Sequence, residues 1–346
     1  TLLTMALAGN VQAAEIRSVG PDGEAAVDAS TIELTDDQIA QIKEGGYTAA
    51  ICLHYGGNDW STSQQKGLED TFGELGIEIV AVTDANFSAE TQVSNIETVM
   101  AKKPDILVSI PTDATATADA YKQAAAAGIK IVFMDQRANG LEAGKDYVSV
   151  VSADNYGNGY ASGTVLGDAL GGKGKVAMVY YDANFAPTNQ RDEGFRDAMK
   201  NYPDIEIVTE QGFTDESGCA EQGDAILTQF PNIDGIYASW DVPMEGVLSA
   251  VRAAGMEGKV TLACNDLGNN VAREIASGNI AGGGAQMPYD QGVAEAKLAA
   301  LALLGEETPS YVAVPAETVT HENVLEAYTD VYHVETPDWL KEAYVE

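Results

Sequence analysis

Short apolar runs alternate with helical segments along most of this chain, and no other feature constrains its fold as strongly. The first series of apolar runs lies at residues 49–53, 77–82, 105–110 and 129–134. The same rhythm restarts in the second half, with runs at 175–181, 205–208, 233–238 and 259–263. Strands that alternate with helices in this way predict βαβ units and parallel sheets covered on both faces. Two series of units predict two sheets, because a single sheet of this many strands would be overlong.

The segments outside the two series extend this prediction. Residues 280–286 predict a further strand, 289–304 a long helix and 311–315 a last extended segment. Near the N-terminus, Thr35 and Gln38 form a capping box, which predicts one helix in an otherwise polar segment. We therefore expect an α/β protein with two parallel sheets, each covered by helices on both faces, preceded by an N-terminal extension at 15–46.

Residues 1–14 predict the compartment of the protein. They combine a short apolar run with a small-x-small ending, Val11-Gln12-Ala13 followed by Ala14. This pattern is typical of the rear of a secretory signal peptide, and the run is too short to span a membrane. We interpret 1–14 as a residual signal peptide and expect an exported protein, periplasmic or otherwise extracytoplasmic, whose mature chain starts near Glu15.

The charge of the chain argues against two classes of partner. The sequence has 19 Lys and Arg residues against 53 Asp and Glu residues, which gives a formal net charge of −34. A surface this acidic repels phosphate backbones and anionic lipid headgroups. We therefore expect neither a nucleic acid nor a membrane surface as the partner.

The cysteines and histidines form no pattern for a metal or a cofactor. The three cysteines show no CxxC pair, and the three histidines show no ligand spacing. Cys52 and Cys264 are expected to be small core residues, while a Cys219–Cys264 disulfide stays open as an alternative. The glycine-rich segment 167–174 lacks the preceding strand and the Ser or Thr of a phosphate-binding loop, so we interpret it as a helix stop. We predict no cofactor, no metal and no catalytic residue.

Polar side chains follow several predicted strands directly. They are Asn58 and Trp60 after the first strand, Asp135 and Gln136 after the fourth, Trp240 and Asp241 after 233–238, Asp266 after 259–263, and Gln286 at the end of 280–286. In open α/β sheets, ligands bind outside the carboxyl ends of the strands. Carboxylates, amides and Arg exchange paired hydrogen bonds with vicinal hydroxyls, and aromatic faces pack on C–H groups. This set therefore predicts a neutral polyhydroxylated ligand.

Two other interpretations of these residues stay open. Each residue alone is readily explained as a turn or a helix cap, and Asp113 before a predicted helix is better explained as an N-cap. Carboxylates at strand ends could also supply the acid and base of a glycosidase, which would reveal itself by turnover of a bound sugar.

Seven segments carry a resemblance to a known family. They are IPTDA (110–114), IVFMDQ (131–136), VSADNYGNG (151–159), RDEGFRDAM (191–199), YASWD (237–241), LACND (262–266) and GGAQMP (283–288). In order and spacing, they resemble the type I periplasmic sugar-binding proteins, the solute receptors of ABC importers, in the ribose-binding subgroup. The resemblance extends from Tyr47 to about Glu322. It implies two doubly wound lobes joined by a three-segment hinge, with a sugar buried between them.

The resemblance also implies lobe boundaries and partners. The three crossovers fall near Ala153, Gln286 and Glu317. They give an N-terminal lobe of 47–153 plus 287–317 and a C-terminal lobe of 154–286 plus 318–346. The implied partners are a small neutral sugar or polyol and the membrane permease of an ABC importer, and the implied state is a monomer.

Residue by residue, the same matching implies a ligand site. Five residues stand at ligand-binding positions of the family: Asn58, Trp60, Asp135, Asp266 and Gln286. Four further site positions are Gln136, which replaces an Arg with Arg137 one place later, Asn189, which replaces another Arg, Trp240, which replaces an Asn, and Arg191, which aligns with a further Arg. Losing two Arg forks and an Asn while gaining an indole favours a smaller or acyclic polyol, a tetritol or pentitol, with a different pentose next.

Two competing functions share the predicted fold. A sugar-sensing receptor for chemotaxis would hold its ligand between the lobes in the same way. An effector domain of the lactose-repressor type would require a basic helix-turn-helix before it, whereas residues 1–46 supply an apolar leader and an acidic segment. We rank both below the importer component.

Overall fold

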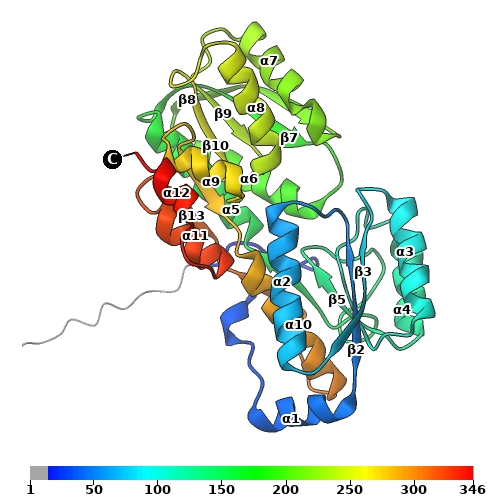
Figure 1. Ribbon diagram of the computed structural model, residues 1–346. Helices are drawn as coiled ribbons and strands as arrows, with labels where there is room; N and C mark the ends of the chain where they lie inside the picture. Colours follow the sequence, from blue (N-terminus) through cyan, green and yellow to red (C-terminus); the bar gives the residue numbers. More distant parts are fainter. Residues whose placement is uncertain (1–14, 346) are drawn as a thin grey trace, which may run out of the picture.

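The computed structural model describes residues 15–345, which fold into two α/β lobes, one above the other in Figure 1. The segment interpreted as a residual signal peptide, 1–14, lies outside the described residues. Each lobe has a central sheet with helices on both faces. The predicted fold class, with two doubly wound sheets, is confirmed.

The lower lobe in Figure 1, called the N-lobe below, contains a seven-stranded parallel sheet with the order β1-β12-β6-β5-β4-β2-β3. Its strands are β1 (Val27–Asp28), β2 (Thr48–Leu53), β3 (Glu78–Asp84), β4 (Ile106–Ser109), β5 (Lys130–Met134), β6 (Ser149–Ala153) and β12 (Tyr311–Val314). The central strands are buried on both faces, which explains their continuous apolar sequences.

The upper lobe, called the C-lobe, contains a six-stranded sheet with the order β13-β11-β10-β9-β7-β8. Its strands are β7 (Lys173–Tyr181), β8 (Asp204–Phe213), β9 (Gly235–Ala238), β10 (Thr261–Cys264), β11 (Gly282–Ala285) and β13 (Glu317–Thr320). Neighbouring strands are parallel except for β11 and β13, which are antiparallel.

Helices cover both faces of each sheet. In the N-lobe, one face is covered by α1 (Asp36–Gly45), α2 (Asp59–Glu74) and α10 (Pro288–Leu303), and the other by α3 (Ala89–Ala101) and α4 (Ala118–Ala126). In the C-lobe, one face carries α5 (Asn155–Ala169) and α6 (Ala186–Met199), and the other carries α7 (Cys219–Gln229), α8 (Asp241–Ala253), α9 (Asn269–Ala276), α11 (Val324–Tyr332) and α12 (Asp338–Ala343). Two short 3-10 helices, η1 (Ala29–Thr31) and η2 (Glu216–Gly218), complete the described elements.

The chain passes between the lobes at three places. Strands β6 and β12 belong to the N-lobe sheet, whereas β11 and β13 belong to the C-lobe sheet. We therefore propose crossovers at Ala153, Gln286 and Glu317, with the lobe boundaries that the resemblance implies. Within the N-terminal extension, β1 pairs with β12 of the N-lobe and Ile42 is buried in the N-lobe core, whereas Arg17 and Ser18 bind Asp154 at the start of α5.

Local sequence signals account for several elements. The predicted capping box is confirmed, because Gln38 N donates to Thr35 Oγ1 and Thr35 N donates to Gln38 Oε1. Strand β8 continues well beyond the predicted 205–208, through polar residues up to Phe213. It is an edge strand that pairs only with β7, so no strand lies on its other side and polar residues are tolerated there.

The cysteines do not form the disulfide that the sequence left open. Cys52, Cys219 and Cys264 are all buried and unbonded among the described residues. The Cys219–Cys264 alternative is therefore wrong, and all three residues act as small apolar core side chains.

Helices α5 and α6 approach each other so closely that glycine is required between them. A Cβ at Gly159 of α5 would lie 1.8 Å from the backbone oxygen of Arg191 in α6. Because backbone atoms cannot rotate away, any larger residue would force the helices apart. This contact fixes the position of α6 and hence of Arg191.

We expect Gly159→Ala to lower the free energy of unfolding by about 3 kcal/mol, since it overpacks a rigid helix contact. Gly73→Ala in α2 is the matched control, because a Cβ there meets no atom within 4 Å. It should instead raise the stability by about 0.5–1 kcal/mol, as alanine favours the helix. Urea unfolding of both variants tests this, and equal effects would contradict the proposed close approach.

Candidate ligand-binding site

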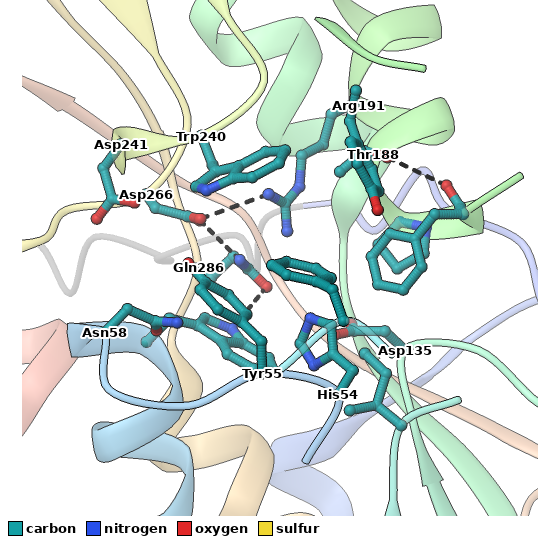
Figure 2. A pocket seen from close by; sticks show the side chains of 16 residues that line it. His54, Tyr55, Asn58, Asp135, Thr188, Arg191, Trp240, Asp241, Asp266 and Gln286 are labelled. Carbon is teal, nitrogen blue, oxygen red and sulfur yellow. Dashed lines mark hydrogen bonds and ion pairs between the residues drawn. The ribbon is translucent and has the colours of Figure 1, made fainter. Parts of the chain in front are cut away.

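A cavity lies between the lobes, at the carboxyl ends of strands from both sheets (Figure 2). Its volume is about 50 Å³ for the centres of water-sized molecules, which is room for roughly three to five waters. The lining residues are His54, Tyr55, Asn58, Trp60, Phe87, Ile110, Asp135, Tyr181, Phe185, Pro187, Thr188, Arg191, Trp240, Asp241, Asp266 and Gln286. Both lobes contribute, so the site is complete only when they face each other closely.

Two aspartates enter the cavity from equivalent turns. Asp135 follows β5 and Asp266 follows β10, and both have a left-handed backbone, with φ of 54° and 71°. Asp135 N donates to Val151 O at 2.8 Å, and Asp266 N donates to Gly284 O at 2.9 Å. Positive φ is uncommon outside glycine, and Asp tolerates it better than most residues. The same turn in each lobe therefore directs one carboxylate into the cavity.

Arg191 of α6 lies at the centre of the site and is only 5% exposed. Its Nε donates to Asn155 Oδ1 at 2.8 Å, and its Nη1 donates to Ser239 O at 3.3 Å and to Asp266 Oδ2 at 3.4 Å. An unpaired buried charge would cost several kcal/mol. These partners, with the carboxylate of Asp266 as the counter-charge, stabilise the guanidinium in the cavity wall.

A second hydrogen-bonded chain joins the hinge to both lobes. Trp60 Nε1 of the N-lobe donates to Gln286 Oε1 at 3.1 Å, and Gln286 Nε2 donates to Asp266 Oδ1 at 2.6 Å (Figure 2). Gln286 follows β11 at the hinge. Its side-chain amide therefore holds Trp60 and Asp266 at a fixed distance from each other.

Asp135 is held by its own lobe and by the start of α5. Its Oδ1 accepts hydrogen bonds from Ser152 Oγ at 3.0 Å, Ala153 N at 3.3 Å and Asn155 Nδ2 at 3.4 Å. No bond to Oδ2 is found among the described residues, so this oxygen remains free to accept from a ligand hydroxyl.

Burial controls the protonation of the carboxyl groups. It raises the pKa of Asp135, an effect that the Arg191 charge opposes. It also raises the pKa of Asp266, again opposed by Arg191 and by the hydrogen bond from Gln286. The pKa of Asp241 is raised most strongly, first by burial and then by the like charge of Asp266. Burial thus shifts all three carboxyl groups toward their neutral forms, and the nearby Arg191 guanidinium opposes this shift at Asp135 and Asp266.

Several buried polar atoms at the cavity have no partner in the described part of the chain. His54 Nδ1 and Asn58 Nδ2 are unpaired. The Oδ1 atom of Asn58 caps α2 by accepting from Ser61 N, which leaves the amide nitrogen for another acceptor. Trp240 Nε1 also has no hydrogen-bond partner. It lies close to Glu216, where it opposes the increase in the pKa of that carboxyl caused by burial. Buried polar groups are normally satisfied, so unpaired atoms here indicate a polar ligand.

Aromatic rings from both lobes close the remaining wall. His54 stacks on Phe185 across the lobe boundary with ring centroids 5.4 Å apart, and Tyr55 stacks on Phe87 at 4.3 Å. Phe87 has a left-handed backbone with φ of 59°. Rings on facing walls exclude water and present flat surfaces to the C–H side of a ligand.

Most of the residues that the sequence indicated meet at this cavity. Those that line it are Asn58, Trp60, Asp135, Arg191, Trp240, Asp266 and Gln286. Their contact with a ligand stays a proposal, which the experiments below address.

Gln136 and Asn189 are corrections to the predicted set, because neither lines the cavity. Gln136 is buried, but its Nε2 donates to Pro111 O at 2.7 Å and its Oε1 accepts from Ala186 N at 3.0 Å. Asn189 is exposed on α6. It lies one residue from Thr188 and two from Arg191, so the helical rotation turns it away from the cavity wall.

Sequence reasoning did not place several lining residues. Tyr55, Phe87, Tyr181 and Phe185 come from loops and strand ends, and Thr188 comes from the first turn of α6. Asp241 belongs to the predicted set of residues that follow strands, and it lines the cavity. The signal that could have found Tyr55 is its place directly after an apolar strand, next to His54.

Residues 15–345 contain neither a candidate metal site nor a candidate membrane span. No cluster of three or more His, Cys, Asp or Glu side chains is arranged to hold a metal ion in this part of the chain. Nor does any described helix have the length and apolar character needed to cross a membrane.

The fold and the site together define a two-lobed binding protein, and comparisons with known proteins agree. A family model described as "Periplasmic binding protein domain" matches residues 49–307. The chain is 29% identical to the D-ribose/D-allose-binding protein of Pseudomonas aeruginosa, over 76% of this chain and 83% of that protein. It is 24% identical to the ribose import binding protein of Salmonella typhimurium, over 79% and 90%. A solute-binding protein from Actinobacillus succinogenes, solved with bound D-allose, is 28% identical with a TM-score of 0.75, covering 81% of this chain and 99% of that one.

The chain belongs to the periplasmic binding protein family, among its type I sugar-binding solute-binding proteins. It is a binding protein and not an enzyme, so the glycosidase alternative is set aside. The predicted extracytoplasmic location is confirmed by the same relatives.

We expect Asp135→Ala to weaken ligand binding at least about 100-fold, because it removes a buried acceptor from the cavity. Asp135→Asn is the matched variant, since Asn tolerates the left-handed backbone and keeps one acceptor oxygen. It should weaken binding less and leave the melting temperature nearly unchanged. Isothermal titration and thermal melting check both, and undiminished affinity in Asp135→Ala would refute the assignment.

The buried imidazole of His54 makes the protein sensitive to acid. Burial, helped by the Arg191 charge, lowers the pKa of His54 to about 3. The pKa of His54 in the unfolded chain is about 6.5, so below this pH the imidazole is protonated in the unfolded chain but stays neutral in the folded protein. His54 therefore costs stability progressively as the pH falls from about 6.5 toward 3.

We expect His54→Phe to remove this loss while keeping a ring stacked on Phe185. Between pH 6.5 and 4.5, the unfolding free energy of the variant should fall less steeply than that of the wild type, by up to ~1.4 kcal/mol per pH unit. Urea unfolding at several pH values measures both slopes. Identical slopes would show that His54 is protonated in the folded state.

Proposed function

We propose that this protein is the extracytoplasmic sugar-binding component of an ABC importer, and that its ligand is a small neutral polyol or sugar: a tetritol, a pentitol or a pentose. The ligand is held between the two lobes and bridges them. Closure then presents a joint surface of both lobes to a membrane permease, and the protein acts as a monomer.

The observation that carries the proposal is the set of polar atoms left free around one small cavity. His54 Nδ1 and Asn58 Nδ2 lack partners, and Asp135 Oδ2 adds an acceptor. Hydroxyl groups satisfy this mixture because each is both a donor and an acceptor. A ligand rich in hydroxyls therefore fits better than an apolar one.

The size of the cavity supports a small ligand. Room for roughly three to five waters corresponds to about 90–150 Å³ of liquid when each water is given its share of about 30 Å³. Trp240, whose ring is buried in the wall, occupies space that a smaller residue would leave open. A tetritol, pentitol or pentose fills such a space better than a disaccharide.

The charge of the cavity supports a neutral ligand. The charge of Arg191 is already paired with Asp266, and burial holds the Asp241 carboxyl toward its neutral form. An anionic ligand would enter without a free counter-ion, which costs several kcal/mol. The relatives named above are described as binding ribose or allose, which are also neutral.

Isothermal titration against erythritol, ribitol, D-arabinose and D-ribose tests the proposal. We expect one site per chain and the highest affinity for one of the two polyols, because they fit a short cavity without a ring. Ribonate is the charged control and should bind about 100-fold more weakly than ribitol or not at all. No heat from any neutral member, or preferred binding of ribonate, would overturn the ligand class.

A further inference from the structure

Two residues of the N-lobe follow cavity residues directly in the chain, yet their side chains bind the C-lobe. Asp59 follows Asn58, and Gln136 follows Asp135. Figure 2 shows Asn58 and Asp135 on opposite sides of the cavity view. Asp59 and Gln136 therefore flank the ligand site without lining it.

Asp59 binds the start of α9. Its Oδ2 accepts from Asn269 N at 2.7 Å, and its Oδ1 accepts from Asn269 Nδ2 at 2.9 Å. The neighbouring Gly268 N donates to Asp241 Oδ2 at 3.0 Å. Two consecutive backbone N–H groups of the C-lobe thus bind different lobes: Gly268 N binds a cavity residue of its own lobe, and Asn269 N binds a carboxylate of the other lobe.

Gln136 binds the start of α6 in the same manner. Its Oε1 accepts from Ala186 N at 3.0 Å, while its Nε2 donates to Pro111 O at 2.7 Å within the N-lobe. Helix α6 carries Arg191, so this bond holds the helix that supplies the guanidinium.

Both backbone donors are the first residues of their helices, since α6 begins at Ala186 and α9 begins at Asn269. Within the described chain, neither helix receives a capping hydrogen bond from the side chain of its own N-cap residue, Phe185 or Gly268. Free N–H groups at a helix start need an acceptor, and the helix dipole favours a carboxylate there. Acceptors from the other lobe supply what the helices lack.

We propose that Asp59 and Gln136 are closure-determining residues: they cap two C-lobe helices only when the lobes are closed, and so set how tightly any ligand is held without selecting which ligand. Opening would break both hydrogen bonds and leave the two backbone N–H groups to water. The inference rests on the proposed function in so far as a ligand is held by the closed lobes.

Ala186→Pro tests the Gln136 contact at its donor. Proline removes the backbone N–H and is tolerated as the first residue of a helix. The preceding Phe185 has an extended backbone, with φ of −126° and ψ of 105°, as a residue before proline requires. Ala186→Ser keeps the N–H at the same exposed position and is the matched control.

Asp59→Ala tests the second contact. Its control is Glu90→Ala, which removes a first-turn carboxylate from α3, another N-lobe helix. Glu90 is exposed and makes no hydrogen bond or ion pair within residues 15–345. Loss of a helix-dipole interaction is common to both variants, and loss of the contact between lobes is confined to Asp59→Ala.

We expect Ala186→Pro and Asp59→Ala each to weaken binding of ribitol and D-ribose about 5- to 20-fold, with the ratio of the two affinities unchanged. Both controls should bind as the wild type does. In small-angle X-ray scattering of ligand-free protein, the Asp59→Ala, Ala186→Pro double variant should show a larger radius of gyration than the wild type. Thermal melting confirms that each variant is folded.

Unchanged affinity together with an unchanged radius of gyration would overturn the proposal. So would a change in the ratio between ribitol and D-ribose, because it would make these residues ligand contacts. If neither compound binds the wild type, the proposed ligand class fails, and scattering of the ligand-free variants alone decides the closure role.

Discussion

The buried guanidinium of Arg191 is the interaction on which the rest of the site depends. A charge this deeply buried is stable only among fixed partners, and here they are Asn155, Ser239 and Asp266. Asp266 in turn accepts a hydrogen bond from the side-chain amide of Gln286, and this amide accepts a hydrogen bond from Trp60 of the other lobe. Through this chain, one charge fixes the geometry of both cavity walls. The close packing of α5 on α6 at Gly159 keeps Arg191 in its position in the cavity wall.

The lobes meet at two kinds of contact, one inside the cavity and one outside it. Inside the cavity, Asp135 and Asp266 enter from matching left-handed turns, and aromatic rings close the wall. Outside it, acceptors of the N-lobe reach the starts of two C-lobe helices. We propose that the first set senses the shape and hydroxyl pattern of a ligand, and that the second responds only to how far the lobes have closed.

Much of this arrangement could be predicted from the sequence, and the exceptions have physical reasons. Asp135, Asp266 and Gln286 follow apolar strands, so local pattern alone places them at the sheet edge. The role of Gln136 could not be predicted, because its partners Pro111 and Ala186 lie far along the chain and meet it only in the folded, closed protein. Asn189 lies outside the cavity because the rotation of α6 turns it away from the side that carries Thr188 and Arg191. Strand β6, the aromatic wall and the capping of α6 and α9 by residues of the other lobe likewise depend on tertiary contacts.

A crystal structure of the protein with the tightest-binding member of the sugar and polyol panel tests the central claim most directly. We expect one ligand between closed lobes, with hydroxyl groups bonded to Asp135 and Asp266 and at least one of His54 Nδ1 and Asn58 Nδ2 satisfied. The contacts of Asp59 and Gln136 with the C-lobe should be present in the same crystal. A ligand bound to one lobe of an open protein, or bound away from this cavity, would contradict the account.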